Sequence, residues 1–459
     1  MLGVLLLRPV FDVDIFWQLK LGEMTLDRGG LVTAEPFAAS HLGEPLAQLA
    51  WLGQIVLAGV RRIGGWSGLR VFDSVVWLSG FVAAALAVRR SMSAPAGIVA
   101  ALLLAFAFIL PFSSLRPQSF AVLGFGLLIA LLASQRPWKT RLLLGAALLI
   151  LWQNLHPSVA IGLLYLGARA GLSWLEVLLR RRTNLPVFDT ALVLLAGLAM
   201  FATPMGIGIL AVSAQNAAAS KAMGVSEWLA VWSEPNAALL PVPGPFPLIV
   251  LALLFLNRKK LDWTWLFPSL VLFVATLFVA RFGLFWALST IPVIAPLLTR
   301  QTEPDPAAGR DCAMAAIGLG LAALLALVFH QPRFAEWFPL KGVAALKAEQ
   351  VRGTVFAELP WGGPLIDAGY PDWQVALDGR YYVYTDAELA MARTIGASPT
   401  ALPQIERVWA PAAVLLDPEI SGSLIQQLRQ QPTVWREIRT GDFSAAFVRV
   451  KPVPVSAAQ

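Results

Sequence analysis

Charged residues, cysteine and histidine are all scarce in this sequence. Only 14% of the 459 residues are charged, against about 25% in an ordinary soluble domain, and 57% are hydrophobic. This composition excludes a soluble enzyme. The single cysteine, Cys312, has no partner for a disulfide within the chain and provides no cysteine-based metal site. The three histidines are His41, His156 and His330.

Several familiar catalytic signatures are missing as well. The sequence has no glycine-rich phosphate loop of the Walker or Rossmann type, no HExxH pair and no nucleophile elbow. Nucleotide-driven, metalloprotease and serine-hydrolase classes therefore have no support. The net charge of +7 is poor evidence for a nucleic-acid partner, because membrane proteins collect lysine and arginine in cytoplasmic loops. We expect no nucleic-acid partner.

Long apolar runs fill the chain up to about residue 330. A helix needs about 20 residues to cross a hydrocarbon core about 30 Å thick. We predict a polytopic α-helical membrane domain of about ten or eleven transmembrane helices over 1–330, and an α/β domain over 331–459. The opening run at 1–11 is short and is expected to belong to a first span. The other candidate spans are 69–88, 94–111, 118–135, 140–154, 157–179, 187–210, 242–257, 262–280, 282–299 and 311–330.

Basic residues indicate how these spans are oriented. By the positive-inside rule their clusters are cytoplasmic, which places 12–68 and the whole of 331–459 outside. The alternation of cytoplasmic and outer ends is consistent only if 46–63 does not span but forms an amphipathic helix on the outer face of the membrane. Residues 14–28 are expected to form a second helix of this kind. The alternative is that 46–63 spans and one later short run does not. The basic clusters lie at 89–90, 136–141, 180–182, 258–260 and 300–310.

Polar side chains that are unusual in an apolar chain fall on the predicted outer side. Ionisable groups at membrane depth are costly and usually face a cavity or a partner, so this set is a candidate site. A carboxylate can accept the proton of an attacking hydroxyl, while an arginine fork holds a phosphate. Asp14 or Asp12 with Arg281 and Arg116 would supply both. The full set is Asp12, Asp14, Glu35, Arg116, Asn154, His156, Glu227 and Arg281.

Most of these residues also have a purely structural interpretation. Arg116 precedes a proline and can snorkel at a helix start. His156 can end a helix, and Asp14 can be the N-cap of the helix that follows it. Arg281 is harder to explain in this way, because it has no charged neighbour in the sequence and requires a partner in space.

The segment after residue 331 has the pattern of a small α/β domain on the outer face, where we expect it to cap the outer cavity. Asp378, Arg380 and Tyr384 follow one of its strands. They either touch a substrate or form an ion pair within the domain. We predict strands at 353–357, 373–378, 412–416, 433–439 and 443–449, and helices at 341–350, 384–395 and 419–431.

Short motifs occur along the chain in an order typical of one group of proteins. They are DVDIFWQLKLGEMTLDRGGLVTAEPF at 12–37, followed by RPQSF, WQNLHPS, ATPMG, SEW, ARF, WGGPLI and VALDGRYYVY. With these motifs the sequence resembles the GT-C superfamily of polytopic glycosyltransferases, and more closely a group of bacterial GT-C-like membrane proteins. The resemblance covers most of the chain.

The resemblance implies polyprenyl-phosphate-linked sugars as donors and a catalytic acid in the first outer loop. It makes Asp14, Asp12 and Glu35 the catalytic candidates, and Arg281 and Arg116 the candidate phosphate-binding residues. No cofactor beyond the donor is predicted, and any divalent metal is left open. The other expected cavity residues are Asn154, His156, Glu227, Trp17 and Gln18.

Two departures from the group's pattern leave an alternative open. Its Trp-His pair is Trp17–Gln18 here, and its His-Glu-Trp is Leu49–Ala50–Trp51. A histidine and an acid are therefore replaced. A non-catalytic GT-C-like scaffold, acting as a subunit of a larger membrane complex, would tolerate these changes and would have a membrane protein partner.

The first expectation is an enzyme that transfers a hexosyl or pentosyl group from a polyprenyl-phosphate donor to a hydroxyl acceptor. Inversion is expected because no second carboxylate is placed as a nucleophile. The predicted location is the outer face of the bacterial cytoplasmic membrane, with membrane lipids and polyprenyl phosphate as partners. A transporter is a weaker third candidate, because the sequence shows no convincing internal repeat.

Overall fold

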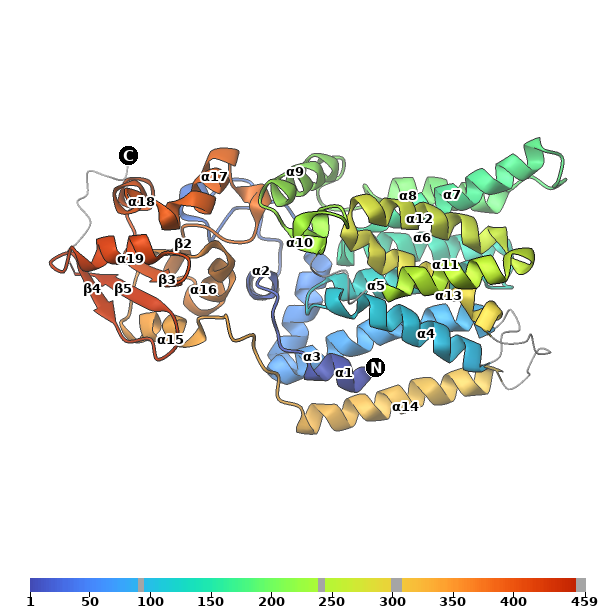
Figure 1. Ribbon diagram of the computed structural model, residues 1–459, viewed down its shortest axis with the longest axis horizontal. Coiled ribbons are helices and arrows are strands. Elements are labelled where there is room, and N and C mark those ends of the chain that lie inside the picture. Colours follow the sequence, from blue (N-terminus) through green and yellow to red (C-terminus); the bar gives the residue numbers. More distant parts are fainter. Residues whose placement is uncertain (90–94, 238–243, 299–307, 451–459) are drawn as a thin grey trace.

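The computed structural model describes residues 1–89, 95–237, 244–298 and 308–450. A bundle of long helices occupies one end of the elongated molecule, and a smaller domain with a sheet occupies the other (Figure 1). The helices up to residue 329 are α1 (Leu2–Leu7), α2 (Asp14–Arg28), α3 (Trp51–Arg89), α4 (Pro95–Ile109), α5 (Gln118–Leu132), α6 (Trp138–Leu155), α7 (Val159–Leu178), α8 (Val187–Ala199), α9 (Gly208–Ala222), α10 (Glu234–Ala237), α11 (Pro245–Leu256), α12 (Trp263–Phe278), α13 (Gly283–Leu298) and α14 (Ala308–Phe329).

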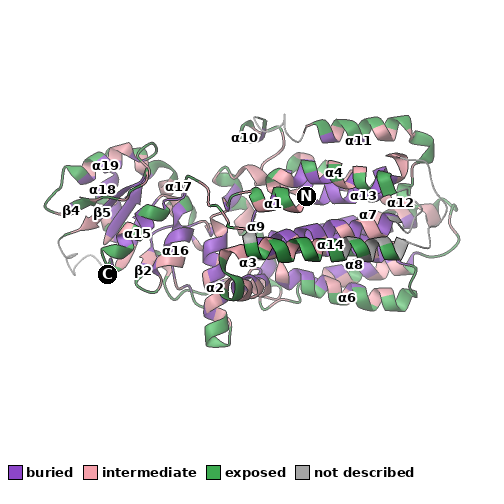
Figure 2. Cartoon of the chain, turned by 90° about the horizontal axis from the view of Figure 1, so that it is seen from below, coloured by how far each residue is buried: buried purple, intermediate pink, exposed green. Residues whose placement is uncertain are grey.

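The bundle has the character of a multi-pass membrane protein. Large apolar side chains such as Leu143, Leu198 and Leu256 are exposed on its outside, beside a buried interior (Figure 2). Within the described ranges, four stretches are long and apolar enough to cross a membrane: Trp51–Val88, Pro95–Phe112, Val159–Leu178 and Ala280–Leu298. Shorter apolar helices accompany them at Gln118–Leu132, Val187–Ala199, Pro245–Leu256, Trp263–Phe278 and Ile317–Val328.

The helix expected at 14–28 is confirmed as α2, and the helix expected at 46–63 is present as the first part of α3, which starts later, at Trp51. Residues just before Trp51 are not helical, and α3 continues to Arg89. Gly65, inside α3, has φ 60° and ψ −158°, a conformation that glycine adopts without steric cost. This non-helical residue therefore divides α3 into two helical parts joined by a kink, and the break falls between the two elements expected at 46–63 and 69–88.

The single span expected at 187–210 is also wrong. It contains the end of α8 at Ala199 and the start of α9 at Gly208. Pro204 and Gly206 lie between them, and proline has no N–H to continue a helix. The unexpected helix α9 runs beside the sheet domain, where Ala219 packs into that domain's hydrophobic cluster (Figure 1).

The sheet domain contains the five predicted strands. They are β1 (Gly353–Ala357), β2 (Trp373–Val375), β3 (Ala413–Leu416), β4 (Trp435–Ile438) and β5 (Ala445–Arg449), in the order β2-β1-β3-β5-β4. The pairs β2–β1 and β1–β3 are parallel, and β3–β5 and β5–β4 are antiparallel. Such a mixed sheet is common in α/β domains.

Three of the domain's helices were expected and two were not. The expected ones are α15 (Leu340–Ala348), α17 (Asp386–Thr394) and α19 (Gly422–Arg429), and the others are α16 (Gly362–Gly369) and α18 (Ala401–Trp409). The sequence of α16, GGPLIDAG, contains three glycines and a proline, which are poor helix formers. Tertiary packing therefore decides its conformation.

Helix α2 lies between the bundle and the sheet domain (Figure 1). One face of α2, with Trp17 and Leu21, shares a buried cluster with Trp361 and Leu365 of the sheet domain. Its opposite face, with Leu19, packs on α3 in another cluster. The first turn of α2 is therefore held between the two parts of the molecule.

The contact between α3 and α5 generates a prediction about stability. A Cβ atom on Gly126 would lie 2.7 Å from the carbonyl carbon of Gly80, so Gly126→Ala must push the two helices apart. We expect a loss of about 1–3 kcal/mol, seen as a lower unfolding temperature in detergent. Gly197→Ala is the control, because nothing lies within 4 Å of its Cβ position. An unchanged unfolding temperature for Gly126→Ala would contradict this packing.

Candidate functional site

Asp12 and Asp14 flank the start of α2. Val13 occupies the N-cap position, and Asp12 Oδ1 accepts a hydrogen bond from the Asp14 backbone N–H at 3.0 Å. Asp12 therefore caps the helix, and the interpretation of Asp14 as the N-cap is wrong by one residue. Asp14 lies in the first helical turn, where its Oδ1 accepts a hydrogen bond from Trp17 Nε1 at 3.0 Å.

A row of alternating charges continues from Asp12 across three separate loops. Asp12 Oδ2 lies 3.2 Å from Arg116 Nη1, and Arg116 Nη2 lies 2.8 Å from Glu227 Oε2. Glu227 Oε1 is in turn 3.6 Å from Arg281 Nη1. Arg281 thus has the spatial partner that its isolated position in the sequence requires. We call Asp12, Asp14, Arg116, Glu227 and Arg281 the charge row.

Short 3₁₀ turns bring the later members of the charge row to this place. Glu227 lies in the turn Ser226–Trp228, and Arg281 lies in the turn Ala280–Phe282. The Arg281 guanidinium also lies 4.3 Å from the ring centre of Trp228, a cation–π contact. Trp228 and Gln118, which accepts hydrogen bonds from Arg116, were not singled out from the sequence, although both lie inside its quoted motifs.

Two carboxyl groups of the charge row, those of Asp14 and Glu227, differ strongly in pKa. Burial and the neighbouring Asp12 charge raise the pKa of Asp14 to about 7, against the opposing effect of the Trp17 hydrogen bond. Burial alone would also raise the pKa of Glu227, but Arg116 and Arg281 lower it to about 2. Glu227 therefore stays ionised, while Asp14 can gain or release a proton near neutral pH.

His156 lies in the same electrostatic field, between α6 and α7. Burial and the charges of Arg281 and Arg116 lower the pKa of His156 to about 3, so its imidazole is neutral. Its Nδ1 is 2.9 Å from the hydroxyl oxygen of Ser158. A neutral imidazole beside two arginines adds no charge to the site.

The segment Asp378–Tyr381 of the sheet domain lies over Asp14. A Cβ atom at Gly379 would come 2.6 Å from Asp14 Oδ1, so the glycine allows the backbone to approach the carboxylate. Burial, followed by the charges of Asp14, Asp378 and Glu227, raises the pKa of Tyr381 to about 12. The sheet domain therefore covers the carboxyl group that titrates near neutral pH.

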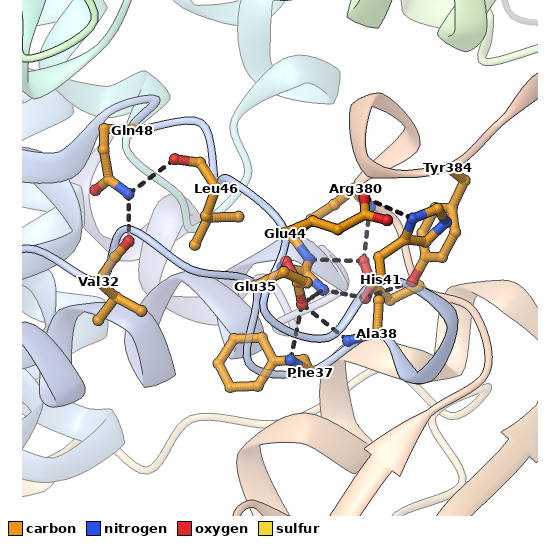
Figure 3. Close-up of polar contacts among 11 residues, drawn as sticks. Val32, Glu35, Phe37, Ala38, His41, Glu44, Leu46, Gln48, Arg380 and Tyr384 are labelled. Atoms are coloured by element: carbon orange, nitrogen blue, oxygen red, sulfur yellow. Dashed lines mark hydrogen bonds and ion pairs between the residues drawn. The ribbon is translucent and has the colours of Figure 1, made fainter. Parts of the chain in front are cut away.

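Glu35 does not lie in the charge row but holds this covering segment in place (Figure 3). Arg380 Nη1 is 2.6 Å from Glu35 Oε2, and Arg380 Nη2 is 2.7 Å from Asp378 Oδ2. Both acids and the arginine are buried. Glu35 Oε1 also accepts hydrogen bonds from the backbone N–H groups of Phe37 and Ala38. We call Glu35, Asp378 and Arg380 the buried clamp.

The buried clamp revises two interpretations made from the sequence. The ion pair expected within the sheet domain, between Asp378 and Arg380, is present, and Tyr384 donates a hydrogen bond to Asp378 at 2.9 Å. The same arginine also binds Glu35 of the loop between α2 and α3. With both its oxygens occupied, Glu35 is a positioning residue in this structure and is not placed to accept a proton.

His41 makes a second contact between the loop that joins α2 to α3 and the sheet domain (Figure 3). Its Nδ1 and Nε2 each lie 3.0 Å from a carboxylate, of Glu44 and of Glu388 respectively. Burial alone would lower the pKa of His41, but the hydrogen bonds to Glu388 and Glu44 raise it. Glu388 belongs to α17, so His41 links the loop to this helix.

Three further residues, Asn154, Trp17 and Gln18, were expected to line the cavity. Asn154 and Trp17 form hydrogen bonds with other side chains of the protein. Asn154 accepts a hydrogen bond from Trp51 Nε1 at 2.7 Å and donates to the carbonyl groups of Ile150 and Ala202. Trp17 contacts Asp14 as described. The side-chain oxygen of Gln18 is buried and has no hydrogen-bond partner within the described residues.

The described residues contain no group of three His, Cys, Asp or Glu side chains that could hold a metal ion. What the charge row does offer is a protein base near neutral pH and two guanidinium groups. Guanidinium groups bind phosphate through paired hydrogen bonds. The arrangement is suited to proton transfer beside an anionic group.

Comparison with solved structures gives the class of fold. The crystal structure of the Archaeoglobus fulgidus oligosaccharyltransferase in the apo form covers 90% of this chain, with a TM-score of 0.50 and 10% identity. The chain spans 66% of the length of that protein. No protein-family model and no curated protein sequence matches the chain.

A second solved structure gives the same result. It is the archaeal oligosaccharyltransferase AglB from Archaeoglobus fulgidus, in complex with an inhibitory peptide and a dolichol-phosphate. The match covers 97% of this chain and 71% of the AglB chain. The TM-score is 0.54 and the identity is 10%. The chain therefore shares its fold, the GT-C fold, with these archaeal proteins.

The buried clamp generates the second prediction. Arg380→Gln leaves two buried carboxylates without their cation, and breaking a buried ion pair in this way costs about 3–5 kcal/mol. We expect earlier thermal unfolding and faster proteolysis of residues 331–459 in the full-length protein. Arg429→Gln is the control, since Arg429 and its partner Glu437 are 56% and 40% exposed. Equal effects of the two substitutions would show that the clamp has no special role.

Proposed function

We propose that this protein is a membrane glycosyltransferase that moves a hexosyl or pentosyl group from a polyprenyl-phosphate donor to a hydroxyl acceptor. The observation that carries the proposal is that Asp14, a half-buried carboxyl group with a pKa of about 7, belongs to the same charge row as Arg116 and Arg281. Base and phosphate-binding groups are the two elements that such a transfer needs.

The reaction follows from these groups. Asp14 accepts the proton of the acceptor hydroxyl as its oxygen forms a bond to the anomeric carbon of the donor sugar. The bond from that carbon to the phosphate oxygen breaks, and the electron pair leaves with the polyprenyl phosphate. Arg116 and Arg281 stabilise the charge that develops on this phosphate. A single displacement of this kind inverts the anomeric configuration.

Glu227 has a separate part in this scheme. It forms ion pairs with both arginines, at 2.8 Å from Arg116 and 3.6 Å from Arg281. A donor phosphate would share these guanidinium groups with Glu227, which keeps the two arginines side by side before the donor binds. In this role Glu227 orients the arginines and takes no proton, consistent with its pKa of about 2.

The solved neighbours support the choice of donor class. AglB was determined with a dolichol-phosphate bound, and dolichol is a polyprenyl-type lipid. We propose a polyprenyl-phosphate donor for this chain by analogy of fold. We further propose the bacterial cytoplasmic membrane as the location, with the charge row and the sheet domain on its outer face, as the distribution of basic residues indicates.

A non-catalytic scaffold within a membrane protein complex is the second candidate. The specific observation in its favour is Gln18, whose buried side-chain oxygen has no partner in the described part of the chain and which replaces a histidine of the group's pattern. Leu49 and Ala50 replace a further histidine and an acid. This candidate requires a stoichiometric protein partner in mild detergent, whereas the enzyme does not.

The assignment of the base is tested with Asp14→Asn. The amide cannot accept the hydroxyl proton, so transfer of a labelled sugar from the lipid-extractable pool of membranes to acceptors should fall by about 10²–10⁴-fold. Wild-type transfer should rise with pH through about 7, because only the ionised Asp14 is a base. Asp27→Asn, at an exposed position of the same helix, should retain activity and this pH profile.

Full activity of Asp14→Asn at wild-type expression would refute Asp14 as the base. Equal loss in Asp14→Asn and Asp27→Asn would point to damage of α2 rather than to removal of a base. The unfolding temperature of each variant separates these outcomes, since the amide has the shape of the carboxylate it replaces.

A further inference from the structure

A second group of arginines lies at the end of the bundle farthest from the sheet domain. A cavity of about 450 Å³ there is lined by Arg141, Arg169 and Arg182, together with Trp138, Phe188 and Asp189. The turn between α7 and α8, which extends from the bundle in Figure 1, contributes Arg182. We call this cavity the basic pocket.

The basic pocket is distinct from the charge row. Trp138, which lines the pocket, is the first residue of α6, while the last residue of α6, Leu155, directly precedes His156 beside the charge row. An α-helix of 18 residues is about 27 Å long. The two sites therefore lie at opposite ends of the bundle, and the inference below does not rest on the proposed function.

Positive charge exceeds negative charge in the basic pocket. Three arginines face a single acid, Asp189, which accepts hydrogen bonds from Arg169 Nε at 3.1 Å and from the Ser173 hydroxyl at 3.2 Å. The Arg141 guanidinium lies 4.0 Å from the ring centre of Phe188, a contact that orients it. Two arginine charges are thus left without an acidic partner among the residues that line the cavity.

Two N–H donors of these arginines have no hydrogen-bond partner. Arg141 Nε and Arg169 Nη1 are both buried, and within the described residues neither has an acceptor. A buried donor without an acceptor is costly, and in a pocket of this charge the natural acceptor is an anion. Arginine N–H groups in such a fork match the oxygens of a phosphate group.

We propose that the basic pocket binds a phosphate group, carried either by an anionic membrane lipid or by a soluble phosphate compound. Its rim favours the lipid. Trp138, Leu185 and Val187 are 48%, 59% and 57% exposed, so apolar side chains adjoin the arginines. Lipid headgroups bind basic pockets between membrane helices through the same combination of arginine and apolar contacts.

The test uses the full-length protein in neutral detergent and native mass spectrometry with added phosphatidic acid or phosphatidylcholine. We expect the protein to retain phosphatidic acid in preference to phosphatidylcholine. Arg182→Gln should weaken this retention about tenfold, because it removes a charge-assisted contact. Arg181→Gln is the matched control: it removes the same charge from the neighbouring exposed residue, which does not line the pocket.

Inorganic pyrophosphate distinguishes the two sources of the phosphate group. If it binds with the same dependence on Arg182 and displaces phosphatidic acid, the natural ligand is a soluble phosphate compound. If the lipid binds and millimolar pyrophosphate leaves it in place, the ligand is a headgroup. Both results support a phosphate site.

Asp189→Asn is an independent test, because it should change the retention of phosphatidic acid in the opposite direction to Arg182→Gln. Removing the single acid of the pocket frees Arg169, so retention of phosphatidic acid should increase. Equal retention of the two lipids by the wild-type protein would overturn the proposal. So would equal weakening by Arg182→Gln and Arg181→Gln, or weaker retention by Asp189→Asn.

Discussion

The ion pairs of Arg380 with Glu35 and Asp378 join the sheet domain to the loop that follows α2. Arg380 lies between an acid of the loop that joins α2 to α3 and an acid of the sheet domain, and all three side chains are buried. Such a triad is stable only when every partner is present, because a lone buried charge is strongly disfavoured. It fixes Gly379 above Asp14, and the sheet domain thereby becomes the cover of the charge row.

Burial under this cover explains the chemistry that we propose. Asp14 has its hydrogen bond from Trp17 but, among the described residues, no direct ion pair, so burial raises its pKa toward neutrality. Glu227, equally buried, contacts two arginines and remains ionised. Two carboxyl groups at one site thus have different roles, set by their neighbours. A proton acceptor beside a pair of guanidinium groups is the arrangement that a phosphate leaving group requires.

Much of this architecture is predictable from the sequence, for physical reasons that differ by element. Apolar length predicts the helical bundle, and alternating patterns predict the five strands. The need of Arg281 for a partner predicts a polar site, which the structure supplies as Glu227. The short helix α16 contains three glycines and a proline, so it depends on tertiary contacts that local patterns do not contain. The same holds for Glu35, whose partner Arg380 is 345 residues away.

The central claim is that the two arginines of the charge row bind the phosphate of a polyprenyl donor. Mass spectrometry of lipids that co-purify with the wild-type protein and with Arg281→Ala tests it without knowledge of the acceptor. The account predicts a polyprenyl phosphate, or its glycosylated form, with the wild-type protein and its loss from the variant. Ordinary phospholipids alone in both samples, together with a stoichiometric protein partner, would contradict the account and favour the scaffold.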